Sequence, residues 1–336
     1  MKNANKSKGF KIPHFIGGLI LVLLFVISGL VFAKLFLLTP APTFGVTFSA
    51  PHARYLELNA WETYDGLIRD LGVKNIRLPV YWNETEKTKG VYDWKETDYF
   101  MEQAAQHGVN ITLVLGAKVP RWPECHIPDF AREKLGTPAY GDDLIDFLQV
   151  AVARYKDSPA LVRYQVENEP LFPFGICPEP DLVLLRREVE TVRQADPDHP
   201  IQLTVSGESE AWLDLAKQAD VLGVSMYRLV WNKGIGPIVY PHSPAWYAVQ
   251  RQTVAPWVQG LIISELQAEP WVDGGGTPTD LAAAYTAFSV QRFRDHVTFA
   301  KRTGFPEVYL WGVEWWYYLK AHGDSRLYDE ASTIFR

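Results

Sequence analysis

The stretch Val166-Glu167-Asn168-Glu169-Pro170 decides the fold, together with a second one, Ile262-Ile263-Ser264-Glu265-Leu266. Each belongs to an apolar, β-branched run that ends abruptly in a carboxylate. Such a run predicts a buried parallel strand, because strands of a parallel sheet are covered on both faces. In an α/β barrel the C-terminal ends of the strands form the mouth that holds the site. Both carboxylates are therefore expected to point into one pocket.

The chain beyond these two stretches alternates between strand-like runs and helical patterns. The predicted strands are Thr43–Ser49, Asn75–Trp82, Asn110–Ala117, Leu161–Glu167, Ile201–Ser206, Val221–Tyr227, Leu261–Glu265 and Glu307–Trp311. The predicted helices between them are Trp61–Leu71, Lys95–His107, Asp142–Tyr155, Asp181–Gln194, Ala211–Gln218, Ala245–Val254 and Asp280–Arg302. After the eighth strand, Asp324–Arg336 is expected to form one final helix. Eight strands in alternation with helices predict a (β/α)8 TIM barrel over residues 39–336.

Three strand-to-helix connections are long and rich in Pro, Trp and Gly. They are Lys118–Gly141 after the third strand, Leu171–Pro180 after the fourth and Arg228–Pro244 after the sixth. Loops of this face build the site in a barrel, whereas loops of the other face stay short. The asymmetry indicates which end of the barrel carries function.

The N-terminus predicts a membrane anchor. Four lysines precede an uncharged run from Phe15 to Ala33, which is followed by Lys34 and a second apolar patch. A helix of this length crosses the roughly 30 Å of a bilayer core. We expect a basic cytoplasmic tail at 1–14, a transmembrane helix at 15–38 and an extracytoplasmic barrel domain, because lysines favour the cytoplasmic side. The alternative is a cleaved signal peptide, although the apolar core of such a peptide is normally about 7–15 residues long.

Composition narrows the partners of the chain. A formal charge of −6 argues against nucleic acid, which is bound by basic surfaces. The only cysteines, Cys125 and Cys177, fall in loops on the same predicted face. One disulfide bridge or two free thiols are both open. We expect a monomer whose partners are a carbohydrate and, through the N-terminal helix, a membrane.

Two carboxylates from different strands are the minimum equipment for cleaving a glycosidic bond, since one protonates the leaving oxygen and the other attacks or stabilises the sugar cation. With these residues the chain resembles the retaining β-glycosidases of the (β/α)8-barrel superfamily, especially cellulase-like families such as glycoside hydrolase family five. The resemblance rests on Asn168-Glu169-Pro170 after the fourth strand and on Glu265 at the end of the seventh. Arg77, Tyr227 and Trp311 stand at further matching positions.

The resemblance implies that Glu169 is the acid/base and Glu265 the nucleophile. The physical chemistry of each residue type agrees. Glu169 must hold a proton, which burial and a negative neighbour favour. Glu265 must stay ionised beside Arg77 and Tyr227. Retention predicts carboxyl groups about 5–5.5 Å apart, against roughly 6.5–9.5 Å for inversion, and the mechanism requires no metal or organic cofactor.

Residues near the two catalytic candidates are expected to bind the sugar or to position the carboxylates. Asn168 is expected to donate to the sugar 2-hydroxyl. Glu167 is expected to support the acid or to pack inside the barrel. Glu269 and Glu314 are alternatives to Glu265, because both are expected to lie close by and could serve instead. The end of the third predicted strand lacks the histidine that many relatives carry, so Lys118, the residue after it, is a candidate for part of that role.

Tryptophans near the predicted strand ends are candidate sugar platforms, because an indole offers a flat apolar face. Trp311 is predicted to form the floor of the sugar subsite. Trp122, Trp231 and Trp271 are weaker candidates, and most others are expected to pack in the core.

The sequence therefore predicts a retaining β-glycoside hydrolase that acts on an oligo- or polysaccharide. The alternatives are a transglycosylase, which uses the same intermediate, and a carbohydrate-binding barrel without turnover. A metal-dependent lyase or isomerase is disfavoured, because histidine ligands at strand ends are absent from the sequence.

Overall fold

The computed structural model describes residues 18, 21–23, 25–26, 41–232, 234, 236–271 and 281–336. The chain divides after Pro40, and the second unit, Ala41–Arg336, holds the barrel. In the described part of the chain, no helix combines the length and the apolar character needed to cross a bilayer. The predicted tail 1–14 lies outside the described residues, and so does the predicted span 15–38 apart from six positions. The anchor therefore stays a prediction.

Eight parallel strands of the described residues close into a barrel. They are β1 (Thr43–Thr47), β2 (Asn75–Pro79), β3 (Asn110–Leu115), β4 (Leu161–Val166), β5 (Ile201–Ser206), β6 (Val221–Met226), β9 (Gly260–Gln267) and β10 (Glu307–Trp311). Each strand pairs with its neighbours in chain order, and β1 pairs with β10 to close the ring. The predicted TIM barrel is confirmed. All eight predicted strands are present, with ends displaced by a few residues at most.

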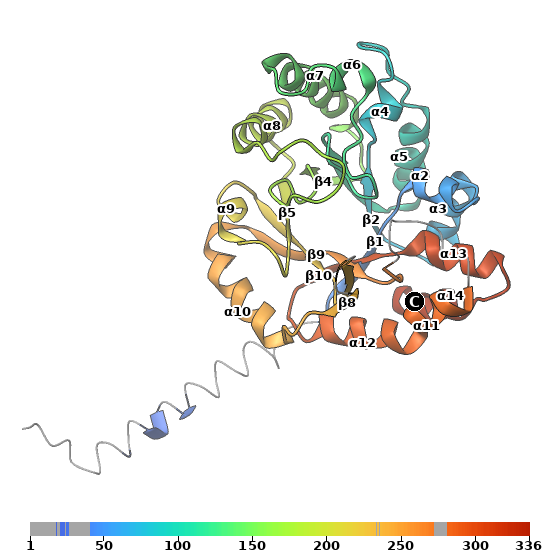
Figure 1. The fold of residues 1–336 in the computed structure, drawn as a ribbon, viewed down its shortest axis with the longest axis vertical. Coiled ribbons are helices and arrows are strands. Elements are labelled where there is room, and N and C mark those ends of the chain that lie inside the picture. The colour runs from blue at the N-terminus through green and yellow to red at the C-terminus, as the bar shows by residue number, and fades with distance from the viewer. Residues whose placement is uncertain are drawn as a thin grey trace, which may run out of the picture. The chain divides into compact units, whose positions relative to one another are not determined.

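Helices surround the strands, as Figure 1 shows for α5, α7, α8, α10 and α12. The helices are α2 (Ala50–Tyr55), α3 (Ala60–Arg69), α4 (Trp82–Thr85), α5 (Lys95–His107), α6 (Asp129–Arg132), α7 (Pro138–Tyr155), α8 (Leu182–Ala195), α9 (Leu213–Ala216), α10 (Pro244–Val254), η2 (Ala255–Trp257), α11 (Leu281–Ala287), α12 (Val290–Lys301), α13 (Val313–Ala321) and α14 (Arg326–Phe335). In α7 the apolar residues at helical spacing, such as Phe147 and Leu148, are fully buried. Burial of one such stripe is what holds a barrel helix on the sheet.

Two helix predictions were wrong, and one helix was missed. The single helix predicted over Asp280–Arg302 is two helices, because Ser289 adopts an extended backbone and caps α12 by accepting from the Arg292 amide. The final helix predicted at Asp324–Arg336 is present as α14, but the sequence did not predict α13, which precedes it. The helix predicted at Ala211–Gln218 is the single turn α9.

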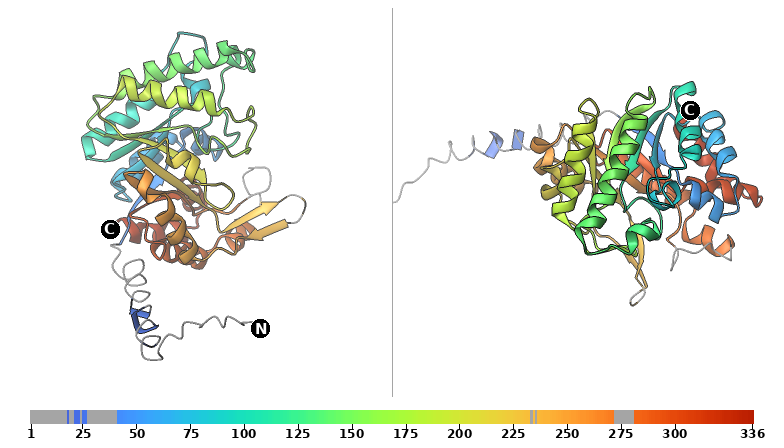
Figure 2. Two further views of the ribbon diagram at one scale, coloured as in Figure 1. Left: turned by 90° about the vertical axis from the view of Figure 1, so that its left-hand side faces the viewer. Right: turned by 90° about the horizontal axis from the view of Figure 1, so that it is seen from above.

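The long loops carry structure of their own. After β6, strands β7 (Leu229–Asn232) and β8 (Gly236–Val239) pair as an antiparallel hairpin, which Figure 2 shows projecting from the barrel. A disulfide bond joins Cys125 in the loop after β3 to Cys177 in the loop after β4. The bridge settles the alternative that the sequence left open and ties together two loops of the functional face.

Candidate active site

The end of β4 places the first carboxylate through a strained backbone. Glu167 and Glu169 have φ angles of 57° and 45°, the left-handed region that few residues other than glycine adopt. Each such residue costs about 1–3 kcal/mol, and strain of this kind gathers at functional sites. The carboxylate of Glu167 accepts from the amides of Ala117 and Lys118, at 2.7 and 2.6 Å. Glu167 therefore fixes the start of the loop after β3.

Gly116 is required by this arrangement. Its φ is 140°, and a Cβ atom there would lie 2.4 Å from Oε1 of Glu167. Only glycine lets the carboxylate approach the backbone so closely.

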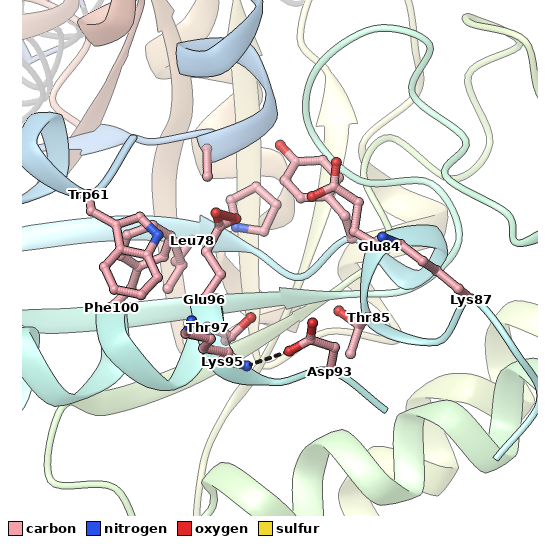
Figure 3. Close-up of a pocket in the computed structure, with 13 residues that line it drawn as sticks. Trp61, Leu78, Glu84, Thr85, Lys87, Asp93, Lys95, Glu96, Thr97 and Phe100 are labelled. Carbon is pink, nitrogen blue, oxygen red and sulfur yellow. Dashed lines mark hydrogen bonds between the residues drawn. The ribbon is translucent and has the colours of Figure 1, made fainter. Parts of the chain in front are cut away.

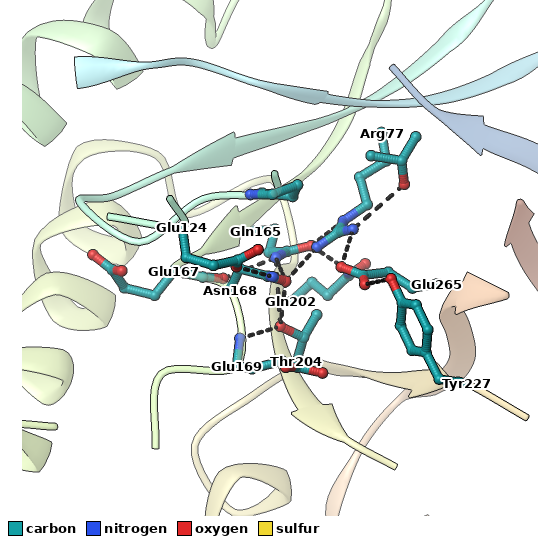
Figure 4. A network of polar contacts seen from close by, with 12 residues as sticks. Arg77, Glu124, Gln165, Glu167, Asn168, Glu169, Gln202, Thr204, Tyr227 and Glu265 are labelled. Atoms are coloured by element: carbon teal, nitrogen blue, oxygen red, sulfur yellow. Dashed lines mark hydrogen bonds and ion pairs between the residues drawn. The ribbon is translucent and has the colours of Figure 1, made fainter. Parts of the chain in front are cut away.

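Arg77, fully buried on β2, forms hydrogen bonds with several side chains of the site (Figure 4). Its Nη1 donates to Oε1 of Glu265 at 2.7 Å, and its Nη2 donates to Oδ1 of Asn168 at 2.6 Å. Its Nε donates to Oε1 of Gln165 at 2.7 Å. One guanidinium thus holds side chains of β4 and β9 in fixed positions, as its planar set of donors allows.

Glu265 on β9 is buried and receives a second charge-stabilising contact. The Tyr227 hydroxyl donates to its Oε2 at 2.9 Å. Burial, followed by the charge of Glu265, raises the pKa of Tyr227 well above its ordinary value. Tyr227 therefore keeps its proton and remains a donor to the carboxylate. An ionised, oriented carboxylate is what a nucleophile requires.

Glu169 is 8% exposed and faces a different environment. Its amide donates to Oγ1 of Thr204 at 2.8 Å, and its carbonyl accepts from Nζ of Lys118 at 2.9 Å. Both contacts fix the backbone rather than the carboxyl group. Burial and the nearby charge of Glu265 raise the pKa of Glu169 well above its ordinary value. A carboxyl that keeps its proton near neutral pH can act as a general acid.

The structure also shows where Lys118 acts. Its ammonium donates to the carbonyls of Glu169 and Phe172, at 2.9 and 2.5 Å. Lys118 therefore orients the loop that follows the acid residue.

Glu124, in the loop after β3, was not predicted to belong to the site. Its Oε2 accepts from Nδ2 of Asn168 at 3.2 Å, and its side chain is almost completely buried. Burial, followed by the charge of Glu265, raises the pKa of Glu124 to about 7. Figure 4 shows Glu124 on the opposite side of Asn168 from Glu265.

Gln165 and Thr204 were also missed. Gln165 bridges Arg77 and Gln202, and Thr204 donates to Oδ1 of Asn168 at 3.2 Å. Both lie on strands, and the alternation of inward and outward side chains along β4 and β5 was the available signal.

The alternative carboxylates are engaged elsewhere. Glu269 and Glu314 both form ion pairs with Arg121, and Glu314 also accepts from the Ser49 amide at 2.5 Å. The guanidinium of Arg121 lies over the ring of Trp311, 4.2 Å from its centroid. Arg121 therefore covers part of one face of Trp311, which is 7% exposed. The assignment of Trp311 as a sugar platform stays a prediction.

The other tryptophans near predicted strand ends differ in their exposure. Trp82, Trp315 and Trp316 are buried and pack in the core. Trp122 is 51% exposed and contacts Phe174, which in turn contacts Trp271. The side chain of Trp231 lies outside the described residues.

A cavity of about 200 Å³ lies between β2 and helices α3 to α5 (Figure 3). Its charged lining includes Glu84 and Glu96, which both pair with Arg54. None of Arg77, Glu169 and Glu265 lines it. Among the residues that the structure describes, no cluster of three or more His, Cys, Asp or Glu side chains is placed to hold a metal ion.

Comparison with solved structures finds the same barrel in glycoside hydrolases, and no protein-family model matches the sequence. GH5_18 from Streptomyces cattleya in complex with GlcNAc is 15% identical, with a TM-score of 0.53 over 81% of this chain and 71% of that one. An exo-β-1,4-mannosidase from Opitutaceae bacterium strain TAV5 is 13% identical, with a TM-score of 0.59 over 88% of this chain and 59% of that one. A β-galactosidase from Bacillus circulans sp. alkalophilus is 13% identical, with a TM-score of 0.57 over 90% of this chain and 56% of that one.

The chain thus spans little more than half the length of the mannosidase and the galactosidase. At the level of the fold, these neighbours confirm the resemblance to the cellulase-like barrel glycosidases that the motifs suggested.

Proposed function

We propose that this protein is a retaining β-glycoside hydrolase with Glu169 as acid/base and Glu265 as nucleophile. One observation carries the proposal. Two buried glutamates lie near the ends of β4 and β9, and one hydrogen-bond network reaches both. Glu265 accepts from Arg77, Arg77 also donates to Asn168, and the Thr204 hydroxyl joins Asn168 to the backbone amide of Glu169. The surroundings of the two carboxyl groups differ. Glu265 has two donors that stabilise its charge, whereas burial beside Glu265 raises the pKa of Glu169. Environments that separate two carboxyl groups in this way assign an acid and a base.

The reaction follows from this assignment. Glu169 gives its proton to the glycosidic oxygen while Glu265 attacks the anomeric carbon, so that a covalent glycosyl-enzyme forms and the aglycone leaves. Glu169, now ionised, takes a proton from water, which attacks the same carbon and releases Glu265. Two inversions leave the configuration retained. A sugar hydroxyl in place of water would give transglycosylation by the same route.

The substrate is proposed to be a β-linked oligo- or polysaccharide. The neighbours support a carbohydrate ligand, since solved complexes of GH5_18 contain GlcNAc and Manβ1-4GlcNAc.

We also propose that the barrel acts outside the cytoplasm, tethered by residues 15–38. The apolar run after four lysines supports a tether. The bond between Cys125 and Cys177 supports export, because disulfides persist in oxidising compartments.

Turnover of aryl β-glycosides tests the proposed activity. The full chain would be assayed on a panel of sugars beside Glu169→Ala, Glu265→Ala and the control Glu133→Ala, which changes an exposed carboxylate of the loop after β3. We expect losses of about 10²–10⁴-fold or more for the two active-site variants and little change for the control. Full activity in either active-site variant would show that the roles are misassigned.

A further inference from the structure

One buried carboxyl of the site has no part in the proposed mechanism. Glu124 is 6% exposed, and within the described part of the chain its side chain has a single hydrogen-bond partner, Asn168. The two cations whose charges act on Glu124, Lys118 and Arg77, form their hydrogen bonds with other groups. Lys118 donates to two backbone carbonyls, and Arg77 donates to Glu265, Asn168, Gln165 and Thr47. Glu124 is thus a buried acid without a hydrogen-bonded cation.

The surrounding loops hold Glu124 tightly in this position. Its φ is 73°, its amide donates to the Arg121 carbonyl at 2.8 Å, and its own carbonyl accepts from Val119 at 2.9 Å. The next residue, Cys125, is bonded to Cys177 of the loop after β4. That loop packs directly on Glu124, since a Cβ on Gly175 would lie 2.6 Å from the Glu124 Cβ. The disulfide bond, the left-handed backbone of Glu124 and the close contact with Gly175 together direct the Glu124 carboxyl into the site.

Stability does not explain a carboxyl in this place. A buried acid without an ion pair is unfavourable, and an apolar or amide side chain of similar size would remove the penalty. Buried acids near like charges are found mainly where they contact a ligand or take part in chemistry.

The orientation of Asn168 indicates what the ligand atom is. Its Oδ1 accepts from Arg77, so its amide nitrogen is turned toward Glu124. One N–H is given to Glu124, and the second is available for the sugar 2-oxygen. A hydroxyl that accepts from Asn168 still has its own proton to donate, and the carboxyl of Glu124 lies beside it.

We propose that Glu124 is a third substrate-binding carboxyl, which accepts a hydrogen bond from the 2-hydroxyl of the sugar held at Glu265. The inference rests on the proposed glycosidase function and adds a specificity to it. The enzyme selects glycosides with a free hydroxyl at C-2, and Asn168 and Glu124 bind that hydroxyl as a donor and acceptor pair.

A cycle between enzyme and substrate tests the contact. kcat/KM would be measured on the aryl β-glycoside that the wild-type protein hydrolyses fastest and on its 2-deoxy counterpart. The proteins are the wild type, Glu124→Ala and the control Glu133→Gln. The different intrinsic reactivities of the two substrates cancel when their ratio is compared between proteins.

We expect Glu124→Ala to lower the ratio of hydroxyl to deoxy substrate by about tenfold or more, as for one charge-assisted hydrogen bond, and Glu133→Gln to leave it unchanged. An equal loss on both substrates would mean that Glu124 only supports the fold, and it would overturn the proposal. Should Glu124→Ala misfold, Glu124→Gln keeps the volume, and a fall in the ratio of about threefold or more is expected because a neutral amide is a weaker acceptor. An unchanged ratio in Glu124→Gln would also overturn the proposal. Absence of turnover by the wild type on every glycoside would refute the glycosidase function itself, and the role of Glu124 with it.

Discussion

Replacing Glu124 by Gln should stabilise the protein more at pH 8 than at pH 5. Burial raises the pKa of Glu124 from an ordinary value of 4.5 to about 7. An acid whose pKa is raised on folding binds more protons in the folded state, so the wild type loses stability as the pH rises from 4.5 through 7. With these pKa values the linkage relation gives a loss of about 0.8 kcal/mol at pH 5 and about 3.3 kcal/mol at pH 8. Gln does not titrate and escapes this loss.

The advantage of the variant over the wild type should therefore grow by about 2.5 kcal/mol between the two pH values. Urea unfolding at pH 5 and pH 8 measures this difference in the free energy of unfolding. For Glu133→Gln, at an exposed position, the difference from the wild type should be the same at both pH values. Other titrating groups are shared by the variant and the wild type, so they largely cancel. A difference for Glu124→Gln that does not change with pH would refute the reasoning that this carboxyl is buried at the expense of stability.

Three further perturbations follow from other parts of the structure. Arg77→Met leaves Glu265 buried without its ion-pair partner and should destabilise the protein by about 3–5 kcal/mol in urea unfolding at pH 7; a loss below about 1 kcal/mol would contradict the role of Arg77 in holding Glu265. The double variant Cys125→Ala with Cys177→Ala removes a bridge between residues 52 positions apart and should lower the free energy of unfolding by about 4 kcal/mol. An unchanged free energy of unfolding would show that the bridge does not stabilise the two loops. Glu188 is buried, and burial followed by the charge of a neighbouring carboxylate raises its pKa well above the ordinary value. Glu188→Gln should therefore be more stable than the wild type at pH 8 and show a smaller gain at pH 5; an equal gain at both would argue against the buried proton.

The barrel could be predicted because its strands are short apolar runs at regular spacing, and Ile201–Ser206 and Glu307–Trp311 match to the residue. Helix α13 could not, because Trp315, Trp316 and Leu319 bury several of its sides and leave no single apolar stripe to recognise. The β7–β8 hairpin was missed because it lies in a loop rich in Pro and Gly, a composition that predicts turns.

The site residues that lie on strands or at strand ends could be predicted from the sequence. Arg77 lies within β2, and Asn168, Tyr227 and Glu265 lie at or near the C-terminal ends of their strands. Direct hydrogen bonds join these four residues, as their places in the barrel implied. Glu124 could not be found in this way. It lies in a loop, and its position depends on the pairing of two cysteines that the sequence left open.

Azide rescue tests most directly whether Glu169 and Glu265 act on one anomeric carbon. With an activated aryl β-glycoside, azide occupies the space of the missing side chain and attacks from that side of the sugar. The account predicts an α-glycosyl azide from Glu265→Ala, formed on the nucleophile's face, and a β-glycosyl azide from Glu169→Ala, formed on the glycosyl-enzyme. A β-configured product from Glu265→Ala, or no rescue of either variant, would contradict the assignment.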